Sequence, residues 1–234
     1  MKTKKSVLER FSPILLIALI LIIWQVLCSL KIIPGYMLPS PVAVIRAFLS
    51  DFPLLMKHLG FTMYEALFGV FISILLAFVT ASLMDRFIVI NKAVYPLLII
   101  TQTIPSIAIA PLLILWMGYG SAPKITLVVI TCYFPLAVSL LSGFASADKD
   151  SISLLKAMGA SRFQIFIHIK IHCAMKHFFS GLKVAVSYSI IGAVISEWLG
   201  GNNGLGVYMT RVKKSYSFDK MFAVIFLISF ISLV

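Results

Sequence analysis

Residues 124–145 read KITLVVITCYFPLAVSLLSGFA, an apolar run with a single lysine at its start. A helix that crosses the hydrocarbon core of a bilayer needs about 20 such residues, so this stretch predicts a membrane-spanning helix. Over the whole chain 61% of the residues are hydrophobic and 12% are charged. Soluble domains average roughly 45–50% apolar and about 25% charged residues. Lipid must therefore cover part of the apolar surface of this protein.

The same pattern recurs along the chain and predicts an all-α membrane protein with about six transmembrane helices. The other five stretches are 13–30, 62–83, 88–115, 182–199 and 221–234. The stretch 88–115 contains three prolines, so we expect a broken helix whose second half is tilted or partly interfacial. The last stretch reaches Val234 after only fourteen residues. We therefore expect the sequence to end inside a truncated sixth helix.

The basic residues lie mainly between the apolar stretches, where they set orientation in a membrane. The formal net charge is +12, yet no basic helix or stacking platform indicates nucleic-acid binding. Placing the N-terminus in the cytoplasm puts twelve Lys and Arg residues inside and eight outside. We expect this orientation, with the cluster 211–220 as the main exception. No small-residue cleavage site follows 13–30, so this stretch is interpreted as a retained first span.

The sequence indicates neither a cofactor nor a metal site. The three cysteines are isolated, with no C-x-x-C spacing. His168, His172 and His177 are spaced by four and five residues, so the third would need a different helical face, and no carboxylate completes a zinc site. The glycine-rich segment 200–206 lacks the G-x-x-x-x-G-K-[ST] pattern of a phosphate-binding loop, as does the rest of the chain. If the activity of this protein is driven by ATP, the nucleotide must bind to a separate subunit.

The polar segment 146–180 predicts two short helices. Asp150 is expected to cap a helix that runs through Met158, and Gly159 is expected to end it. Ser161 and Gln164 then have the spacing of a capping box, which starts a second helix with an apolar face. A helix–glycine–helix unit on a cytoplasmic surface is suited to docking into a groove of a partner protein.

The residues LKAMGASRFQIF (155–166) resemble the cytoplasmic EAA loop of ABC importer permeases. In the pattern E-A-A-x-x-x-G, Gly159 matches the glycine, and Ile169 matches the isoleucine of the following I-x-L-P. The Glu-Ala-Ala positions hold Ser153, Leu154 and Leu155, so no role of the glutamate is carried over. The Leu-Pro positions hold Ile171 and His172. The resemblance implies contact with an ATPase through Leu155, Met158, Gly159, Ala160, Ser161, Phe163 and Phe166.

The resemblance covers nearly the whole chain, through the blocks QTIP (102–105), WMGYG (116–120) and SEWLGG (196–201). Within the ABC importer permeases, the chain most resembles the nitrate, sulfonate and taurine branch. The residues MDRF (84–87) add a likeness to permeases for thiamine-precursor pyrimidines or riboflavin. It implies an ABC type-1 importer permease domain over 58–234 with a cytoplasmic coupling loop at about 146–180. Residues 1–57 would form the first span and an amphipathic segment on the outer surface.

This family resemblance implies that the protein is a transport subunit in the bacterial cytoplasmic membrane and not an enzyme. It would move a small solute by alternating access, as a homodimer in the lipid bilayer with two ATPase subunits and an extracytoplasmic solute-binding protein. A thiamine-precursor pyrimidine is the solute that the motifs favour, with riboflavin, alkanesulfonate, taurine and nitrate as alternatives. An ion-coupled secondary transporter is the alternative class, and it would need buried ionisable residues along the spans.

The candidates for the solute path are Gln102, Pro105, Trp116 and Glu197. Acids within a membrane are costly and often line a cavity, although Glu197 would also suit a pair with a nearby Lys or Arg. The amide, proline and aromatic groups would suit a flat heteroaromatic solute, whereas aromatic residues at a membrane boundary are also ordinary interface anchors. Thr62 and Glu65 have the spacing of a capping box, so they are expected to begin the second span.

Overall fold

The computed structural model describes residues 7–233, which form helices joined by short turns, with no strand among them. The predicted all-α class is confirmed. The basic residues at positions 2–5 and Val234 lie outside the described residues. The chain divides into two compact units. The first comprises the residues up to Met56 together with Tyr208–Leu227, and the second comprises Lys57–Val207 together with the residues from Ile228 onward.

The first unit contains α1 (Val7–Ser29) and α2 (Pro41–Ser50), and parts of α10 (Leu205–Lys214) and α11 (Phe218–Leu233). The hydroxyl of Ser40 accepts a hydrogen bond from the N–H of Ala43 and caps α2. The Trp24 ring of α1 packs on Phe222 and Phe226 of α11, with ring centroids 6.4 and 5.9 Å apart.

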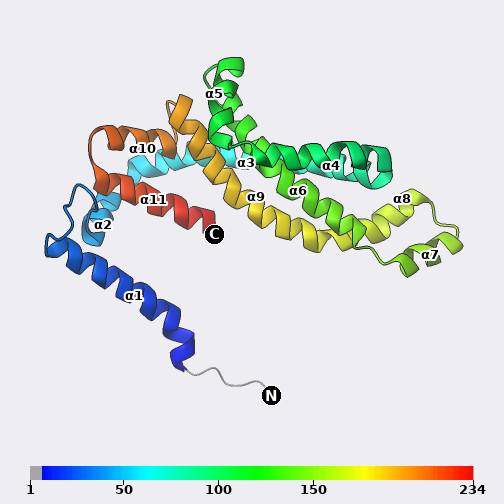
Figure 1. Cartoon of the computed structure of the whole chain (residues 1–234), viewed down its shortest axis with the longest axis horizontal. Helices are drawn as coiled ribbons and strands as arrows, with labels where there is room; N and C mark the ends of the chain where they lie inside the picture. Colours follow the sequence, from blue (N-terminus) through cyan, green and yellow to red (C-terminus); the bar gives the residue numbers. More distant parts are fainter. Residues whose placement is uncertain (1–6, 234) are drawn as a thin grey trace. The chain divides into compact units, whose positions relative to one another are not determined.

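The second unit is built around two long helices, α6 (Ala122–Ala145) and α9 (Ile171–Gly200), which pack side by side (Figure 1). Most of α3 (Phe52–Arg86) joins them in the hydrophobic core. The other elements are α4 (Ile88–Thr103), α5 (Ser106–Met117), α7 (Lys149–Ala157), α8 (Arg162–Ile165) and a π-helix, η1 (Phe166–Lys170).

Small residues bring the backbones of α6 and α9 into direct contact. A Cβ added at Gly143 of α6 would lie 2.6 Å from the Cα of Ala174 on α9. In the same way, a Cβ at Gly181 of α9 would lie 2.6 Å from the Cβ of Ser139 on α6. Within a bilayer, helices associate by such close packing of small residues, because lipid leaves little hydrophobic driving force between them. The glycines at these two positions therefore fix the spacing of the pair.

The predicted number of six spans is not confirmed. Among the described residues, three helical runs are long and apolar enough to cross a membrane: Phe52–Arg86, Ala122–Ala145 and Arg162–Gly200. The bent pair α4–α5 makes a fourth if it counts as one span. Among the described residues, the first of the predicted stretches is represented by the apolar helical segment Leu15–Ser29 and the last by α11, which has 16 residues.

The break predicted in the stretch 88–115 is confirmed. It lies between α4 and α5, whose axes differ in direction by 100° (Figure 1). Ile104 has the extended backbone that a following proline favours, with φ −86° and ψ 119°, and Pro105 has no N–H to continue the helical ladder. Pro96 and Pro111 lie inside helices, so one of the three prolines makes the bend.

Candidate functional site

The helix–glycine–helix segment has the local geometry of a sharp turn at Gly159. Gly159 has φ +82°, a left-handed conformation that ends α7, and the N–H of Ala160 donates to the carbonyl of Leu155 at 2.9 Å. The cap at the other end of α7 is Asp148 and not the predicted Asp150. Its carboxylate accepts from the N–H of Ser151 at 2.9 Å, and Asp150 lies already within the first turn. The hydroxyl and the backbone N–H of Ser151 both donate hydrogen bonds that lower the pKa of Asp148, and the hydroxyl has the larger effect.

The predicted capping box is present at the start of α8. The N–H of Ser161 donates to Oε1 of Gln164 at 2.7 Å, and the N–H of Gln164 donates to the hydroxyl of Ser161 at 3.3 Å. The second helix is not a separate short element, however, because α8, η1 and α9 form one helical run, Arg162–Gly200. The π-helical turn of η1 adds a residue to that run.

Two large apolar side chains of this segment are exposed. Met158 is 73% exposed and Phe163 is 71% exposed. The predicted coupling residues Leu155, Met158, Gly159 and Ala160 line a shallow pocket together with Gln164 and His168. Phe166 differs from them, because its ring packs against Phe144 of α6, with centroids 5.1 Å apart.

An ion pair that the sequence did not reveal ties this segment to α3. The Nζ of Lys170, the last residue of η1, lies 2.6 and 2.7 Å from the two carboxylate oxygens of Asp85. The sequence alone gives Asp85 no partner 85 residues away. The pair holds η1 against the C-terminal end of α3.

At the other end of α9, five buried side chains form what we call the buried polar cluster: His58, Thr62, Glu65, Lys124 and Glu197. Lys124 of α6 lies 2.7 Å from the Oε1 of Glu65 on α3. Glu197 of α9 accepts from the hydroxyl of Thr62 at 2.7 Å and from the N–H of Gly206 at 2.6 Å. The cluster therefore joins α3, α6 and α9 to the start of α10.

The predicted capping box at Thr62 and Glu65 is wrong. Helix α3 begins at Phe52, ten residues earlier, and both side chains lie buried inside it. Each side chain bonds to a partner on another element instead: the Thr62 hydroxyl donates to Glu197, and Oε1 of Glu65 accepts from Lys124. Neither side chain is needed as a cap.

The structure separates the four candidates for the solute path. Gln102 and Pro105 line a cavity of about 310 Å³ at the bend between α4 and α5, which we call the break pocket. Trp116 lies near the end of α5 with 70% of its surface exposed, and Glu197 lies in the buried polar cluster with 1% exposed. Neither of these two residues lines the break pocket.

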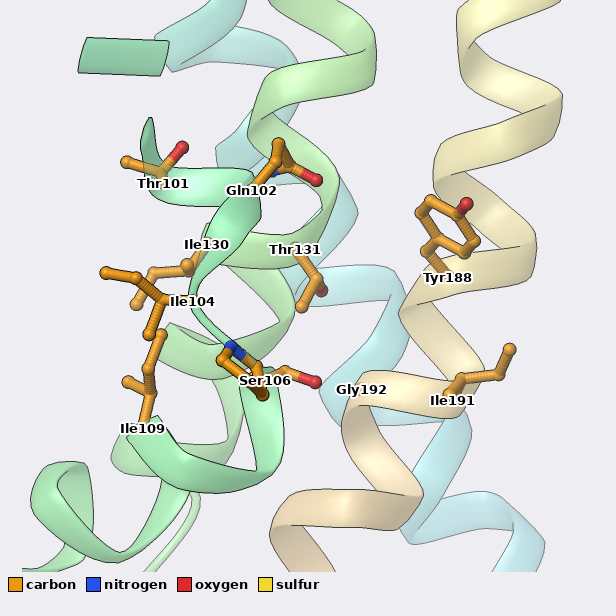
Figure 2. Close-up of a pocket in the computed structure, with 11 residues that line it drawn as sticks. Thr101, Gln102, Ile104, Ser106, Ile109, Ile130, Thr131, Tyr188, Ile191 and Gly192 are labelled. Atoms are coloured by element: carbon orange, nitrogen blue, oxygen red, sulfur yellow. The ribbon is translucent and has the colours of Figure 1, made fainter. Parts of the chain in front are cut away.

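The polar side chains of the break pocket come from three separate parts of the chain: Thr101, Gln102, Ser106, Thr131 and Tyr188. In Figure 2, Gln102 and Ser106 on one side and Tyr188 on the other point toward the space between the bend and α9, with Thr131 of α6 behind it. Sequence reasoning missed Thr131 and Tyr188, because single polar residues on buried helices carry no local signal. The remaining lining residues are isoleucines, Pro105 and Gly192.

The chain matches one protein family and several individual proteins. The family described as "Binding-protein-dependent transport system inner membrane component" matches residues 69–234. A probable ABC transporter permease protein of Haemophilus influenzae is 35% identical over 221 residues, which cover 94% of this chain and 90% of the relative. The formylaminopyrimidine transport permease protein ThiX of Halalkalibacterium halodurans is 33% identical over 226 residues, with coverages of 96% and 90%.

A solved structure supports the fold. A chain of the MetNI methionine ABC transporter in an inward-facing conformation aligns with a TM-score of 0.60, over 76% of this chain and 87% of that one. The sequence identity is 17%, so this likeness concerns the fold alone. It confirms that the helices are arranged as in an ABC importer permease.

Proposed function

Because the chain belongs to the family of binding-protein-dependent transport system inner membrane components, we propose that it forms the solute path of an ATP-driven importer in which a separate subunit hydrolyses ATP. In this proposal the permease acts as a homodimer with two ATPase subunits and an extracytoplasmic binding protein. No phosphate-binding loop occurs in the 234-residue sequence, which supports a separate ATPase. Closure of the ATPases would move the permease between outward-open and inward-open states.

The observation that carries this proposal is the exposed pair Met158 and Phe163 on either side of Gly159. Both side chains are more than 70% exposed, and Phe163 lies at the start of the helical run Arg162–Gly200, which contains Glu197. Large apolar side chains on a polar turn are suited to insertion into a groove of a partner. We propose that the coupling loop, at about 146–180, contacts the ATPase through Leu155, Met158, Gly159, Ala160, Ser161, Phe163 and Phe166.

The orientation follows from the same proposal. With the coupling loop in the cytoplasm, the N-terminus is also cytoplasmic, residues 58–234 form the permease domain, and the segment around α2 lies on the outer side. We propose a thiamine-precursor pyrimidine as the solute, because a relative that is 33% identical over nearly its full length bears a name for formylaminopyrimidine transport. Among the four candidates for the path, Gln102 and Pro105 are those we retain.

Transport in proteoliposomes tests the function. With the ATPase and binding protein present, uptake of a formylaminopyrimidine should require ATP hydrolysis and persist after an ionophore collapses ion gradients. Riboflavin, an alkanesulfonate, taurine and nitrate are the comparison solutes. Uptake by the permease alone that the ionophore abolishes would contradict the proposal and favour an ion-coupled carrier.

Substitution of Gly159 by valine tests the coupling loop. The left-handed φ of +82° strains any β-branched residue, while no atom lies within 4 Å of the added Cβ. We expect ATPase association and transport to fall at least about tenfold, a loss of ~1.4 kcal/mol in binding, with membrane insertion intact. Gly118→Val is the matched control, since Gly118 has φ +78° and equally open surroundings. Normal ATPase association in Gly159→Val would count against the assignment.

A further inference from the structure

We propose that the break pocket is the solute-binding site of the permease and that it selects uncharged, planar, hydrogen-bonding solutes over anions. This inference rests on the function proposed above and deepens it. It names Gln102, Thr131 and Tyr188 as the residues that determine specificity.

The bend itself provides polar backbone at membrane depth. The last carbonyls of α4 and the first N–H groups of α5 lack the regular i to i−4 backbone partners, because the ladder is interrupted at Ile104 and Pro105. Local bonds satisfy two of them, since the hydroxyl of Thr103 donates to the carbonyl of Ile100 and the N–H of Ala108 donates to the carbonyl of Pro105. Backbone of this kind is tolerated within a bilayer where it lines a water-filled cavity or is buried in protein. A cavity of about 310 Å³ lies at this bend, close to the lower end of the range for small-molecule sites, roughly 300–1,000 Å³.

Two side chains of the pocket, Gln102 and Tyr188, offer hydrogen-bonding groups that could bind a solute. Within residues 7–233, no hydrogen bond involves the amide of Gln102 or the hydroxyl of Tyr188. The Thr131 hydroxyl lies 3.1 and 3.0 Å from the carbonyls of Leu127 and Val128 on its own helix, so toward the cavity it can act as an acceptor. An amide that both donates and accepts matches the alternating ring nitrogens and amino group of an aminopyrimidine.

The Tyr188 ring adds a flat apolar surface. It is 48% exposed and points toward the cavity (Figure 2). Aromatic rings favour offset stacking on other flat rings, so this face is suited to a heteroaromatic solute. The lining also includes the apolar residues Ile104 and Ile109, of the kind found in most small-molecule sites.

The absence of cationic side chains from the lining sets the charge preference. None of the eleven lining residues is Lys, Arg or His. An anion that leaves bulk water for this pocket would form no ion pair with a lining residue to offset the hydration it gives up. The Lys124 of α6 is seven residues before Thr131, about 10 Å along the helix, and it is paired with Glu65. A sulfonate or nitrate ion would thus find no charge partner in the break pocket.

Direct binding to the detergent-solubilised permease–ATPase complex tests this inference, with the binding protein left out so that its own affinity does not contribute. The probe is a radiolabelled formylaminopyrimidine in equilibrium dialysis, with taurine and nitrate as competitors. We expect Gln102→Leu and Thr131→Val each to weaken binding by about three- to tenfold, as for loss of one hydrogen bond. Tyr188→Ala should weaken binding more than Tyr188→Phe, which keeps the ring.

The controls separate this inference from the function on which it depends. Tyr64→Ala removes a ring that is 55% exposed on α3, outside the break pocket, and should leave binding unchanged. If the wild-type complex shows ATP-dependent uptake and all three pocket positions can be changed without effect on binding, the pocket assignment is wrong while the importer stands. Competition by taurine or nitrate equal to that by unlabelled pyrimidine would overturn the charge preference. Absence of ATP-dependent uptake by the wild type would instead refute the proposed function.

Discussion

The buried polar cluster and the break pocket are both built on α6 and α9, but they use opposite chemistry. The cluster contains the ion pair of Lys124 and Glu65 and the carboxylate of Glu197, and all three side chains are buried and bonded to other parts of the protein. The break pocket has no Lys, Arg, His, Asp or Glu in its lining, and Gln102 and Tyr188 are exposed there. Charges in this permease hold helices together, whereas neutral groups face the cavity.

The difference follows from the cost of charge in a membrane. An ionised side chain at membrane depth is retained where it finds a partner, and Lys124 finds one on α3. Such a pair adds little net stability over an apolar core, yet removal of one member leaves the other charge buried and uncompensated. Substitutions in the buried polar cluster should therefore lower the stability of the fold, whereas substitutions in the break pocket should weaken solute binding.

The largest effect is expected for Lys124→Met. This substitution leaves the carboxylate of Glu65 without its counter-charge, which should cost about 3–5 kcal/mol of stability. The double variant Lys124→Met/Glu65→Gln removes both charges and should recover most of the loss. Thermal unfolding in detergent, followed by size-exclusion chromatography, measures both variants. If the single variant is as stable as the double variant, the cluster is not held together by this pair.

A smaller loss is expected for Gly204→Ala. Gly204 has φ +118°, and an added Cβ would collide with the carboxylate of Glu197. We expect destabilisation of about 2–3 kcal/mol, from backbone strain and displacement of a buried hydrogen-bonded group together. Gly120→Ala is the matched comparison, because Gly120 has φ +149° with no atom within 4 Å of the added Cβ. Equal unfolding temperatures for the two variants would show that the contact between position 204 and Glu197 does not contribute to the stability of the fold.

The smallest effect is expected at a third polar site, the ion pair of Asp51 and Lys220 in the first unit, with oxygen and nitrogen 2.8 Å apart. Burial opposes ionisation of Asp51, but hydrogen bonds from Lys220, Tyr208 and Ser50 outweigh it and lower the pKa of the carboxyl. Because the folded pKa is below the unfolded value, the stabilisation is present at neutral pH and is lost as the pH falls from about 4 through the folded pKa.

Lys220→Met should therefore lower stability at pH 7 by less than about 1 kcal/mol, and its difference from the wild type should shrink at acidic pH. Unfolding temperatures measured between pH 3 and 7 test this prediction. A difference that stays constant over that range would mean that Lys220 acts through packing and not through its charge. The comparison with Lys124→Met then shows how much burial adds to the cost of losing a lysine.

Sequence reasoning succeeded where the signal is local. The apolar stretches predict helices, the three prolines of 88–115 predict a break, and the spacing of Ser161 and Gln164 predicts a cap that forms within four residues. The error at Asp150 is of the same kind, because two acids lie close together and Asp148, the one just before α7, takes the cap. Such signals are read from neighbouring residues alone.

The sequence could not predict which distant residues meet. Glu65 and Thr62 have the spacing of a cap, yet their partners, Lys124 and Glu197, are 59 and 135 residues away. The polar lining at Thr131 and Tyr188 is missed for a related reason, since helical periodicity does not tell a cavity-facing residue from one that faces another helix. Partner choice at that range depends on how the helices pack, and that information is spread over the whole chain.

The close contact of α6 and α9 has a mechanical consequence. Gly143 of α6 packs directly on Ala174 of α9, and Gly181 of α9 packs directly on Ser139 of α6. The two helices therefore cannot slide or roll on each other without a steric collision. We therefore expect the pair to move as a single rigid lever during a transport cycle. One joint of that lever would be the turn at Gly159, which precedes the helical run that contains α9 and lies outside the contact.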